Sequence, residues 1–512
     1  MKITNNKLIT MVAGIFFFSA CQPLSEYEVN PNSPSEGQVP PTLILTNVIA
    51  NTLGAYRPIV GTYNGWAQYI ASISSQQGDI SFQGYLGSEA SFSPYSVLRD
   101  VASMEFEGDR INTPAYSGIA NFFKVYCLMD MTMQMGDIPM NDALKGKSES
   151  NFTPKYDSQK DVFMNCLSLL EEANSILGDA VTRKVSVGSG DLIYGGDVAG
   201  WQKAVNALRL RILINLSKKV DDTDLKIKEQ FAEILNNPSK YPLFTSNDDN
   251  MTFKWYDIEG NRYLLFYQLA NSDYYRIGNT YYNLIKKYND PRISVIAERT
   301  KEAVTANPDN IEFDIIITII TIHTTVFHNI KFYIIWISGY RLFRTLGNKA
   351  SIYNRTYYCT PTGEPMILLG YSELCFNIAE AINRGWIQGD AEEQYEKGIR
   401  ASMQFYGISE SVISEYLHSS VVAYGGQLEQ ILNQKYIAFF NNSGWEPFYN
   451  IRRTGIPVLN IGDNMNNPSG KIPVRWRYPQ TEYQTNEANV QEAIKRQFDG
   501  TDGVDNLMWL LQ

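Results

Sequence analysis

Side chains that perform covalent catalysis are scarce in this chain of 512 residues. Only three histidines occur, which argues against a multi-histidine metal centre and against histidine-based acid–base catalysis. Glu373 and Glu380 share one face of a predicted helix, but seven helical residues span about 10.5 Å. That separation exceeds the spacing of paired carboxyls that flank a glycosidic bond. A secreted hydrolase is an alternative that the scarce histidine and the lack of a nucleophile elbow or zinc motif disfavour, and no metal or cofactor is expected.

Aromatic side chains are abundant, and several lie among polar residues in a mixture that suits sugar binding. The chain has 33 Tyr, 24 Phe and 8 Trp. Sugar rings stack their C–H faces on Trp and Tyr, while amides, carboxylates and guanidinium groups bond the hydroxyls. This pattern predicts as ligand-binding residues Trp66, Tyr69, Asp79, Tyr85, Trp255 and Tyr275. Core packing is the alternative for each aromatic residue, and the three-residue spacing of Trp66 and Tyr69 also fits a buried helix face.

The first twenty residues have the features of an export signal. Two lysines precede the apolar run Leu8–Phe18, which has about half the length that a membrane-spanning helix needs. Two small residues stand directly before Cys21, as in a bacterial lipobox. We therefore predict a lipoprotein signal peptide over 1–20, acylation of Cys21, for example by palmitate, and a lipidated tether over 21–40. An ordinary signal peptide with a chance cysteine is the alternative.

Composition and charge limit the partners that this chain can have. The formal net charge is −10 and the pI is near 5.1, so no basic stripe is available to neutralise phosphates and no nucleic-acid partner is expected. Hydrophobic residues make up 44% of the chain, enough for a large core. Cys127, Cys166 and Cys375 have apolar neighbours at helical spacing and are predicted to be buried. A disulfide among these and Cys359 stays open.

Helical patterning dominates from about residue 41, and the helices are predicted to pack in pairs. Ser158, with an aspartate three residues later, predicts a capped helix to about residue 177, and the segment 116–135 is its candidate partner. Segments 366–384 and 391–406 form a second candidate pair. We predict a mostly α fold of tetratricopeptide-like helix pairs in a single domain over 41–512. Long irregular loops, where binding is usually placed, are expected at 76–95, 180–200 and 240–275.

A further helix is predicted over 201–219. Its apolar stripe consists of Trp201, Val205, Leu208, Ile212 and Leu216. Arg209 and Arg211 lie off this stripe. A helix of this kind is expected to bury one face and to leave the charged residues outside it.

The segment 312–346 differs from the rest of the chain in composition. Its centre, Ile315–Ile337, is rich in β-branched residues and long enough to span a membrane, but His323, His328 and Lys331 argue against insertion. A pair of buried strands is a second interpretation, and translation out of frame between two compensating coding shifts is a third. The third fits the abrupt change in composition best, and re-sequencing the coding DNA would test it. The two histidines have no evident third ligand, so zinc binding is not expected.

Several short motifs are spread in order along the chain. They are Asn30-Pro31-Asn32-Ser33-Pro34, Gly136-Asp137-Ile138-Pro139, Tyr194-Gly195-Gly196-Asp197, Asn206-Ala207-Leu208-Arg209-Leu210-Arg211, Asn289-Asp290-Pro291-Arg292, Phe376-Asn377-Ile378-Ala379-Glu380-Ala381, Gly398-Ile399-Arg400-Ala401-Ser402-Met403, Gln434-Lys435-Tyr436, Arg452-Arg453-Thr454-Gly455-Ile456-Pro457 and Arg477-Tyr478-Pro479. Together they resemble the SusD/RagB family of outer-membrane lipoproteins, in its SusD-like branch. The resemblance extends from residue 30 to about 495 and weakens near 312–346.

The resemblance implies a lipid-anchored, surface-exposed protein of the bacterial outer membrane. It implies a SusD-like domain that captures a nutrient, closes over a SusC-type TonB-dependent transporter and delivers the nutrient to it without breaking bonds. Glycan and peptide ligands both remain open, and the aromatic content favours glycan. A surface scaffold or adhesin that holds protein partners on helical repeats is the alternative. A gene for a large TonB-dependent barrel next door would favour import.

Physical chemistry gives most of these motifs folding roles rather than ligand contacts. Gly136, with a proline beyond it, is a helix stop signal. Arg452 and Arg453 are expected to form bidentate pairs with carboxylates, and capture of an acidic substrate is the alternative. Glu482 is expected to form an ion pair with Arg477 that holds a turn.

Overall fold

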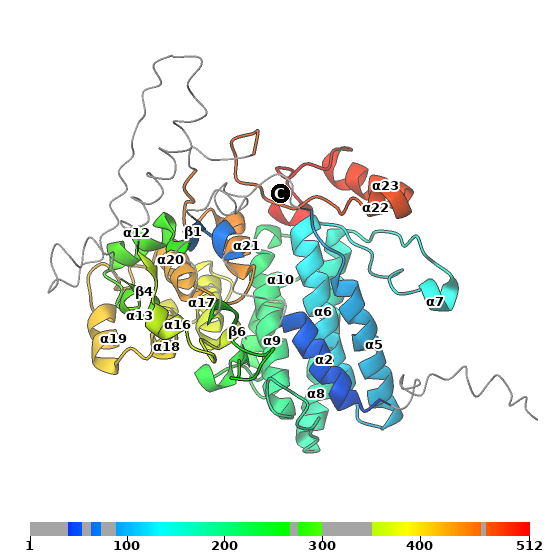
Figure 1. The fold of residues 1–512 in the computed structure, drawn as a ribbon, viewed down its shortest axis with the longest axis horizontal. Coiled ribbons are helices and arrows are strands. Elements are labelled where there is room, and N and C mark those ends of the chain that lie inside the picture. The colour runs from blue at the N-terminus through cyan, green and yellow to red at the C-terminus, as the bar shows by residue number, and fades with distance from the viewer. Residues whose placement is uncertain (1–38, 54–62, 73–88, 267–274, 299–350, 462–466) are drawn as a thin grey trace, which may run out of the picture.

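The computed structural model describes residues 39–53, 63–72, 89–266, 275–298, 351–461 and 467–512. Cys21, Asp79, Tyr85 and the segment 312–346 lie outside these residues, so the predictions made for them stay predictions. The described part is mostly helical, which confirms the predicted fold class (Figure 1). None of its helices combines the length and the apolar character that crossing a bilayer requires.

Long helices lie side by side in the N-terminal half of the molecule (Figure 1). The elements of this half are α2 (Pro41–Leu53), α3 (Tyr63–Trp66), β1 (Ile70–Ser72), α5 (Pro94–Arg110), α6 (Ala115–Met135), α7 (Gly146–Glu149), α8 (Gln159–Thr182), α9 (Val198–Asn215), η2 (Ser217–Lys219), α10 (Ile227–Asn236), η3 (Asn247–Asp249) and β2 (Met251–Phe253).

The C-terminal half has shorter helices and longer connections. Its elements are β3 (Tyr275–Ile277), α12 (Asn279–Tyr288), α13 (Ile293–Ile296), β4 (Ala297–Glu298), β5 (Ile352–Tyr353), α16 (Arg355–Tyr358), β6 (Met366–Leu369), α17 (Tyr371–Asn383), α18 (Ala391–Phe405), α19 (Glu410–Leu417), α20 (Leu428–Ala438), α21 (Glu446–Thr454), α22 (Glu482–Thr485), α23 (Glu487–Phe498) and η4 (Trp509–Leu511).

The predicted pairing of α6 with α8 is confirmed. The Ser158 side chain caps α8 by accepting a hydrogen bond from the Asp161 amide at 3.1 Å, which satisfies a donor that the first helical turn leaves free. The helix α6 ends at Gly136, whose φ of +100° is a backbone conformation that favours glycine. Gly118 brings the two helices close together, because a Cβ atom there would lie 2.8 Å from the Leu177 side chain.

The helix α9 lies at the centre of the molecule and is buried on all sides rather than along one stripe. It begins at Val198, capped by the Asp197 side chain, and ends four residues before the predicted limit at Lys219, where a short 3-10 turn follows. Arg209 and Arg211 are only 4% and 6% exposed, so the expectation that they lie outside the packed face is wrong. Both guanidinium groups are buried because they pair with the carboxylates of Glu171 and Glu373. These partners come from other helices, and the sequence of α9 itself contains no carboxylate.

The second predicted pair is α17 with α18. Its first boundary differs most from the prediction, and each helix ends one residue before the predicted limit. Residues Met366–Leu369 form β6, which pairs with β2, and the helix starts after Gly370. The short strand segments β1 and β3, and β4 and β5, are likewise paired across long sequence separations. These small sheets tie the loops to the helical body.

Gly398 on α18 lets that helix approach α17, and replacing it with alanine is expected to lower the free energy of unfolding by about 1–3 kcal/mol. A Cβ atom at this position would lie 2.8–2.9 Å from ring atoms of Phe376, which packs from α17. Urea unfolding measures the change. The matched control is Gln404→Ala on the exposed side of α18, for which a change below about 0.5 kcal/mol is expected. An unchanged midpoint for Gly398→Ala would show that the two helices need no such close approach.

The predicted loop over 180–200 is organised by the buried carboxylate of Asp191. Its oxygens accept hydrogen bonds from the backbone amides of Ile193, Tyr194 and Gly196 at 3.0–3.2 Å, and from the Trp201 indole at 2.8 Å. The Tyr-Gly-Gly-Asp motif therefore has a folding role, because it wraps the chain around one carboxylate before α9 begins.

The described cysteines are free, and burial follows the prediction. Cys127, Cys166 and Cys375 are buried, and Cys359 is partly buried. Burial raises the pKa of the Cys166 thiol and of the Cys375 thiol well above their ordinary values, which keeps both protonated and unreactive.

Candidate functional site

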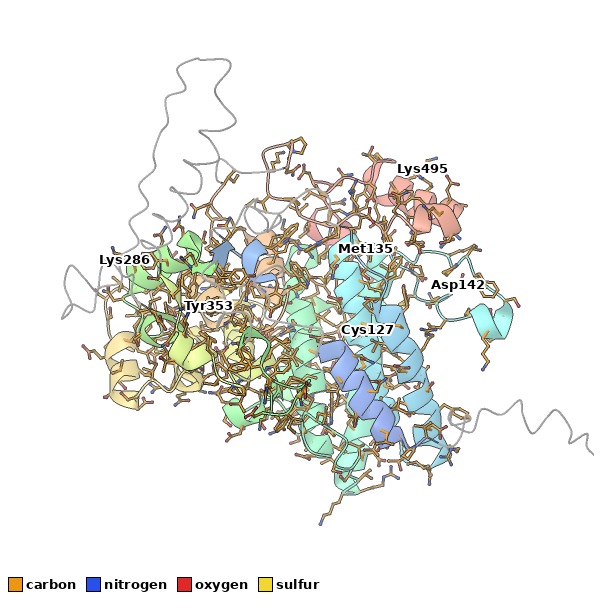
Figure 2. The ribbon with its side chains drawn as sticks, viewed as in Figure 1. Cys127, Met135, Asp142, Lys286, Tyr353 and Lys495 are labelled. Atoms are coloured by element: carbon orange, nitrogen blue, oxygen red, sulfur yellow. The ribbon has the colours of Figure 1, made fainter. Side chains whose placement is uncertain are left out.

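A cavity of about 630 Å³ lies where α2, α5 and α6 meet the turn before α21. Its volume falls within the range of about 300–1,000 Å³ that is typical of small-molecule sites. Figure 2 places Cys127, one of its lining residues, about halfway along α6 beside α2. The described lining residues are Asn51, Thr52, Tyr63, Ser93, Pro94, Ser96, Val97, Arg99, Asp100, Tyr126, Cys127, Asp130 and Trp445.

The aromatic wall of the cavity is anchored in a cluster of rings. Trp445 is half-buried and lies edge-on to Trp476 at 4.8 Å, to Trp66 at 6.1 Å and to Tyr63 at 6.2 Å between ring centroids. Trp66 in turn stacks on Trp476 at 4.8 Å. Such edge-to-face packing fixes the orientation of the Trp445 ring, so the indole presents a rigid apolar surface to the cavity.

Among the residues that the structure describes, two buried hydroxyls on side chains that line the cavity have no hydrogen-bond partner. They are the Tyr63 phenol and the Thr52 hydroxyl, on side chains that are 2% and 7% exposed. Burial raises the pKa of Tyr63 well above its usual value, with the Glu364 carboxylate as the second cause, so the phenol stays protonated and able to donate. Buried polar atoms are normally satisfied, so these two hydroxyls are exceptions to that rule.

The polar side of the cavity carries charged groups on α5 and α6. Asp100 accepts a hydrogen bond from the Asn47 side-chain amide at 2.9 Å, which connects α5 to α2. Asp130 accepts one from the Gln134 amide, one turn further along α6, at 3.0 Å. Both carboxylates are partly buried, whereas the neighbouring Arg99 is exposed. Aromatic rings, hydroxyls and carboxylates thus converge on one space.

The structure gives packing roles to the sequence-predicted aromatic residues that it describes. Tyr69 is fully buried, stacks on Tyr436 at 4.5 Å and donates a hydrogen bond to the Tyr436 carbonyl at 2.6 Å. Trp66, Trp255 and Tyr275 are 6–8% exposed. None of the four is among the described residues that line the cavity, although Trp66 lies directly behind Trp445. Their role in ligand binding stays a prediction.

Trp445 is the functional candidate that the sequence interpretation missed. It follows the run Asn441-Asn442-Ser443-Gly444 and directly precedes α21. The same signal that selected residues 63–69, an aromatic residue within a polar, turn-rich segment, was present here. This signal does not predict which ring of an aromatic cluster lies outermost.

The charged motif residues form buried ion pairs rather than a catalytic or capture site. Glu373 pairs with Arg211 in a bidentate contact that includes a 2.6 Å bond to Nε. Glu380 accepts from both terminal nitrogens of Arg453, at 2.6 and 2.9 Å. Each carboxylate therefore has its own guanidinium partner, as expected of structural pairs and not of a glycosidase dyad.

The two arginines of the Arg452-Arg453 motif have different roles. Arg453 confirms the predicted carboxylate pair. Arg452 instead donates to the backbone carbonyls of Val474, at 2.9 Å, and Met133, and its guanidinium lies over the Tyr449 ring. Glu482, expected to bond Arg477, accepts a hydrogen bond from the Tyr156 phenol at 2.6 Å. Backbone and phenol groups from distant segments, which local sequence does not reveal, supply these partners.

Comparison with known proteins shows the family. The model of the SusD-like family, described as starch-binding and associating with the outer membrane, matches residues 31–479. This chain belongs to the SusD-like family. No curated protein gave a significant match.

Solved structures of SusD-like proteins have the same fold as this chain. A SusD homologue from Bacteroides fragilis is 30% identical with a TM-score of 0.79, and the match covers 93% of this chain and 100% of that one. An outer-membrane protein from Bacteroides vulgatus, described as involved in nutrient binding, is 30% identical with a TM-score of 0.77 over the same shares. A chitin-binding SusD homologue from Flavobacterium johnsoniae is 18% identical, with a TM-score of 0.68 over 93% and 98% of the two chains, and shows the fold alone.

The SusD-like fold accounts for the tetratricopeptide-like helix pairs, and the family description places such proteins at the outer membrane. Among the described residues there is no group of three or more His, Cys, Asp or Glu side chains that could hold a metal ion.

Proposed function

We propose that this SusD-like protein binds an oligosaccharide in the cavity beside Trp445 and does not cleave it. The observation that carries the proposal is that the oriented Trp445 indole lines the cavity together with Tyr63 and Thr52, whose hydroxyls have no partner among the described residues. A sugar ring would stack on the indole and its hydroxyl groups would bond the two buried oxygens. The starch-binding description of the family supports a glycan over a peptide.

Calorimetric titration of the purified protein with maltotetraose, chitotetraose and a tetrapeptide mixture tests this function. Saturable binding of a glycan with no release of shorter sugars, checked by chromatography, is the expected result. If only the peptides bound, the ligand would be a peptide and not a glycan. Binding of none of these compounds, together with retention of protein partners at the cell surface, would favour the scaffold or adhesin alternative.

We further propose that the protein is a surface lipoprotein, acylated at Cys21, that hands its ligand to a SusC-type TonB-dependent transporter. Membership of an outer-membrane-associated family and the lipobox-like sequence before Cys21 support this. Purification from detergent-solubilised outer membrane, followed by mass spectrometry, should find the acyl group on Cys21 and a large barrel protein in the same complex. A Cys21→Ser variant should leave the membrane fraction. Recovery of unacylated protein without a barrel partner would contradict the proposal.

The Tyr63 phenol provides a sharper test of the cavity, because removing it separates binding from folding. Tyr63→Phe deletes an unpartnered hydroxyl, so the free energy of unfolding should stay equal or rise, while glycan affinity falls about five- to tenfold with the loss of one hydrogen bond. Tyr116→Phe is the matched control. It removes a buried phenol that donates to the Val187 carbonyl at 2.7 Å, and should lower stability by about 1 kcal/mol without changing affinity. Unchanged glycan binding in Tyr63→Phe would exclude the phenol as a ligand contact.

A further inference from the structure

We propose that a buried hydrogen bond between Asn64 and Asn441 positions the aromatic wall of the cavity for ligand binding. The Asn64 side-chain amide donates to the Asn441 side-chain oxygen at 2.8 Å, across 377 positions of the sequence. Neither residue is among the described residues that line the cavity, but each belongs to a segment that supplies a lining ring. This inference rests on the proposed function and adds the residues that hold the site in shape.

The bond joins the segments of two aromatic lining residues. Asn64 follows Tyr63 in α3, and Asn441 begins the four-residue turn that ends directly before Trp445. The Tyr63 and Trp445 rings contact each other edge-on, with centroids 6.2 Å apart. The two asparagine side chains are buried, at 0% and 2% exposure. A buried bond is stronger than an exposed one because no water competes for its donor and acceptor, so this bond holds the two segments together.

The turn before Trp445 has an unusual backbone. Three of its four residues have positive φ, which is +60° at Asn441, +61° at Ser443 and +57° at Gly444. Glycine adopts this conformation at no steric cost, whereas asparagine and serine adopt it at a cost. Such conformations persist only where the surrounding structure holds them, so the turn depends on its contacts with other segments.

Contacts from β5 and β6 also hold the turn. The Asn441 side chain accepts a second hydrogen bond, at 3.0 Å, from the Tyr353 phenol of β5. The next two residues of the turn bond both backbone groups of Ile367 in β6, at 2.9 and 2.8 Å. The bonds to Ile367 involve neither Asn64 nor Asn441, so they should keep the turn folded when the bond between the two asparagines is lost.

The expected consequence of losing the bond is a more mobile Trp445 ring. With the bond in place, the indole is oriented before the ligand arrives. Without it, the ligand must immobilise the indole as it binds, and ordering a side chain on binding reduces affinity. We therefore expect affinity to fall although neither asparagine touches the ligand.

Asn441→Gly tests the inference, because glycine keeps the positive φ and removes the side-chain bonds. Calorimetric titration with maltotetraose and chitotetraose should show an affinity about three- to tenfold below that of the parent protein. Asn64→Ala breaks the same bond from α3 and should lower affinity by a similar factor. The matched control is Asn112→Gly, at an exposed residue with a φ of +53° outside the cavity, which should leave affinity unchanged.

Two further measurements separate positioning from a general loss of stability. In protein labelled with 5-fluorotryptophan, the fluorine resonance of Trp445, assigned from Trp445→Phe, should be sharp in the parent and broadened or shifted in Asn441→Gly and Asn64→Ala. In a Trp445→Ala background, Asn441→Gly should have no further effect on affinity, because no ring is left to position.

The inference would be overturned by an unchanged Trp445 resonance or by unchanged affinity in both asparagine variants. An equal loss of affinity with and without Trp445 would overturn it too, because the bond would then act through another part of the protein. If the parent protein bound neither glycan, the proposed function would fail, and the Trp445 resonance would still show whether the bond positions the ring.

Discussion

Replacing Trp445 with alanine is expected to weaken glycan binding by at least about tenfold, the equivalent of about 1.4 kcal/mol. The indole is half-buried in the cavity wall, and its orientation is held by edge-on contacts with Trp476 and Trp66. A rigid aromatic anchor in the centre of a site carries a large share of the binding energy, because little entropy is lost when the ligand stacks on it. Titration with maltotetraose and chitotetraose measures the effect.

The controls separate loss of stacking from general damage. Phe152→Ala removes another aromatic ring, one that is 75% exposed and outside the cavity, and should leave affinity unchanged. Trp445→Phe keeps a smaller ring and should lose less affinity than the alanine variant. Thermal unfolding confirms that each variant is folded. A folded Trp445→Ala protein with the affinity of the parent would show that the ligand binds elsewhere.

Replacing Arg453 with methionine is expected to lower the free energy of unfolding by about 3–5 kcal/mol. The Arg453 guanidinium is buried and donates two bonds to the fully buried carboxylate of Glu380. Methionine fills much of the volume but leaves that carboxylate without its main counter-charge. Breaking a buried pair is costly for this reason, even where the intact pair contributes little net stability. Urea unfolding followed by circular dichroism measures the loss.

Two further variants test the cause of that destabilisation. Arg183→Met breaks the exposed pair with Asp179 and should change stability by less than about 0.5 kcal/mol. The double variant Glu380→Gln with Arg453→Met removes the uncompensated charge and should recover part of the stability lost in the single variant. If Arg453→Met lowered the free energy of unfolding no more than Arg183→Met does, the buried pair would not be needed for stability.

The same pair gives a pH dependence with a definite sign. Burial alone raises the pKa of Glu380, but Arg453, with Lys435 and Arg384, lowers it to about 2. Its stabilising contribution is therefore present above the unfolded value of about 4.3 and is lost as the pH falls toward 2. Without Arg453, burial would raise this pKa, so the single variant should lose less stability than the parent over that acid range. If the parent protein and the Arg453→Met variant lost the same stability over that acid range, Glu380 would not be the group responsible.

Local sequence signals predicted individual elements well. The Ser158 cap, the Gly136 stop and the helix over 391–406 need only neighbouring residues, and the structure has all three. The segment Met366–Leu369 was expected to be helical, but it forms a strand. Local periodicity did not reveal the strand, because its partner β2 lies more than a hundred residues away in the sequence. Arg211 was expected outside the packed face for the same reason, since its partner Glu373 comes from another helix.

By itself, the sequence determined the helical class and the pairing of neighbouring helices, because caps, glycines and apolar spacing act over a few residues. The SusD-like family came from the resemblance of motifs spread in order along the chain, and the family model confirms it. Only the tertiary structure decided which aromatic ring faces the cavity. Trp66 and Trp445 have equally suggestive neighbours in sequence, but packing buries the first behind the second. Which ring is left on the surface depends on contacts among segments almost 400 residues apart, and no local pattern contains that information.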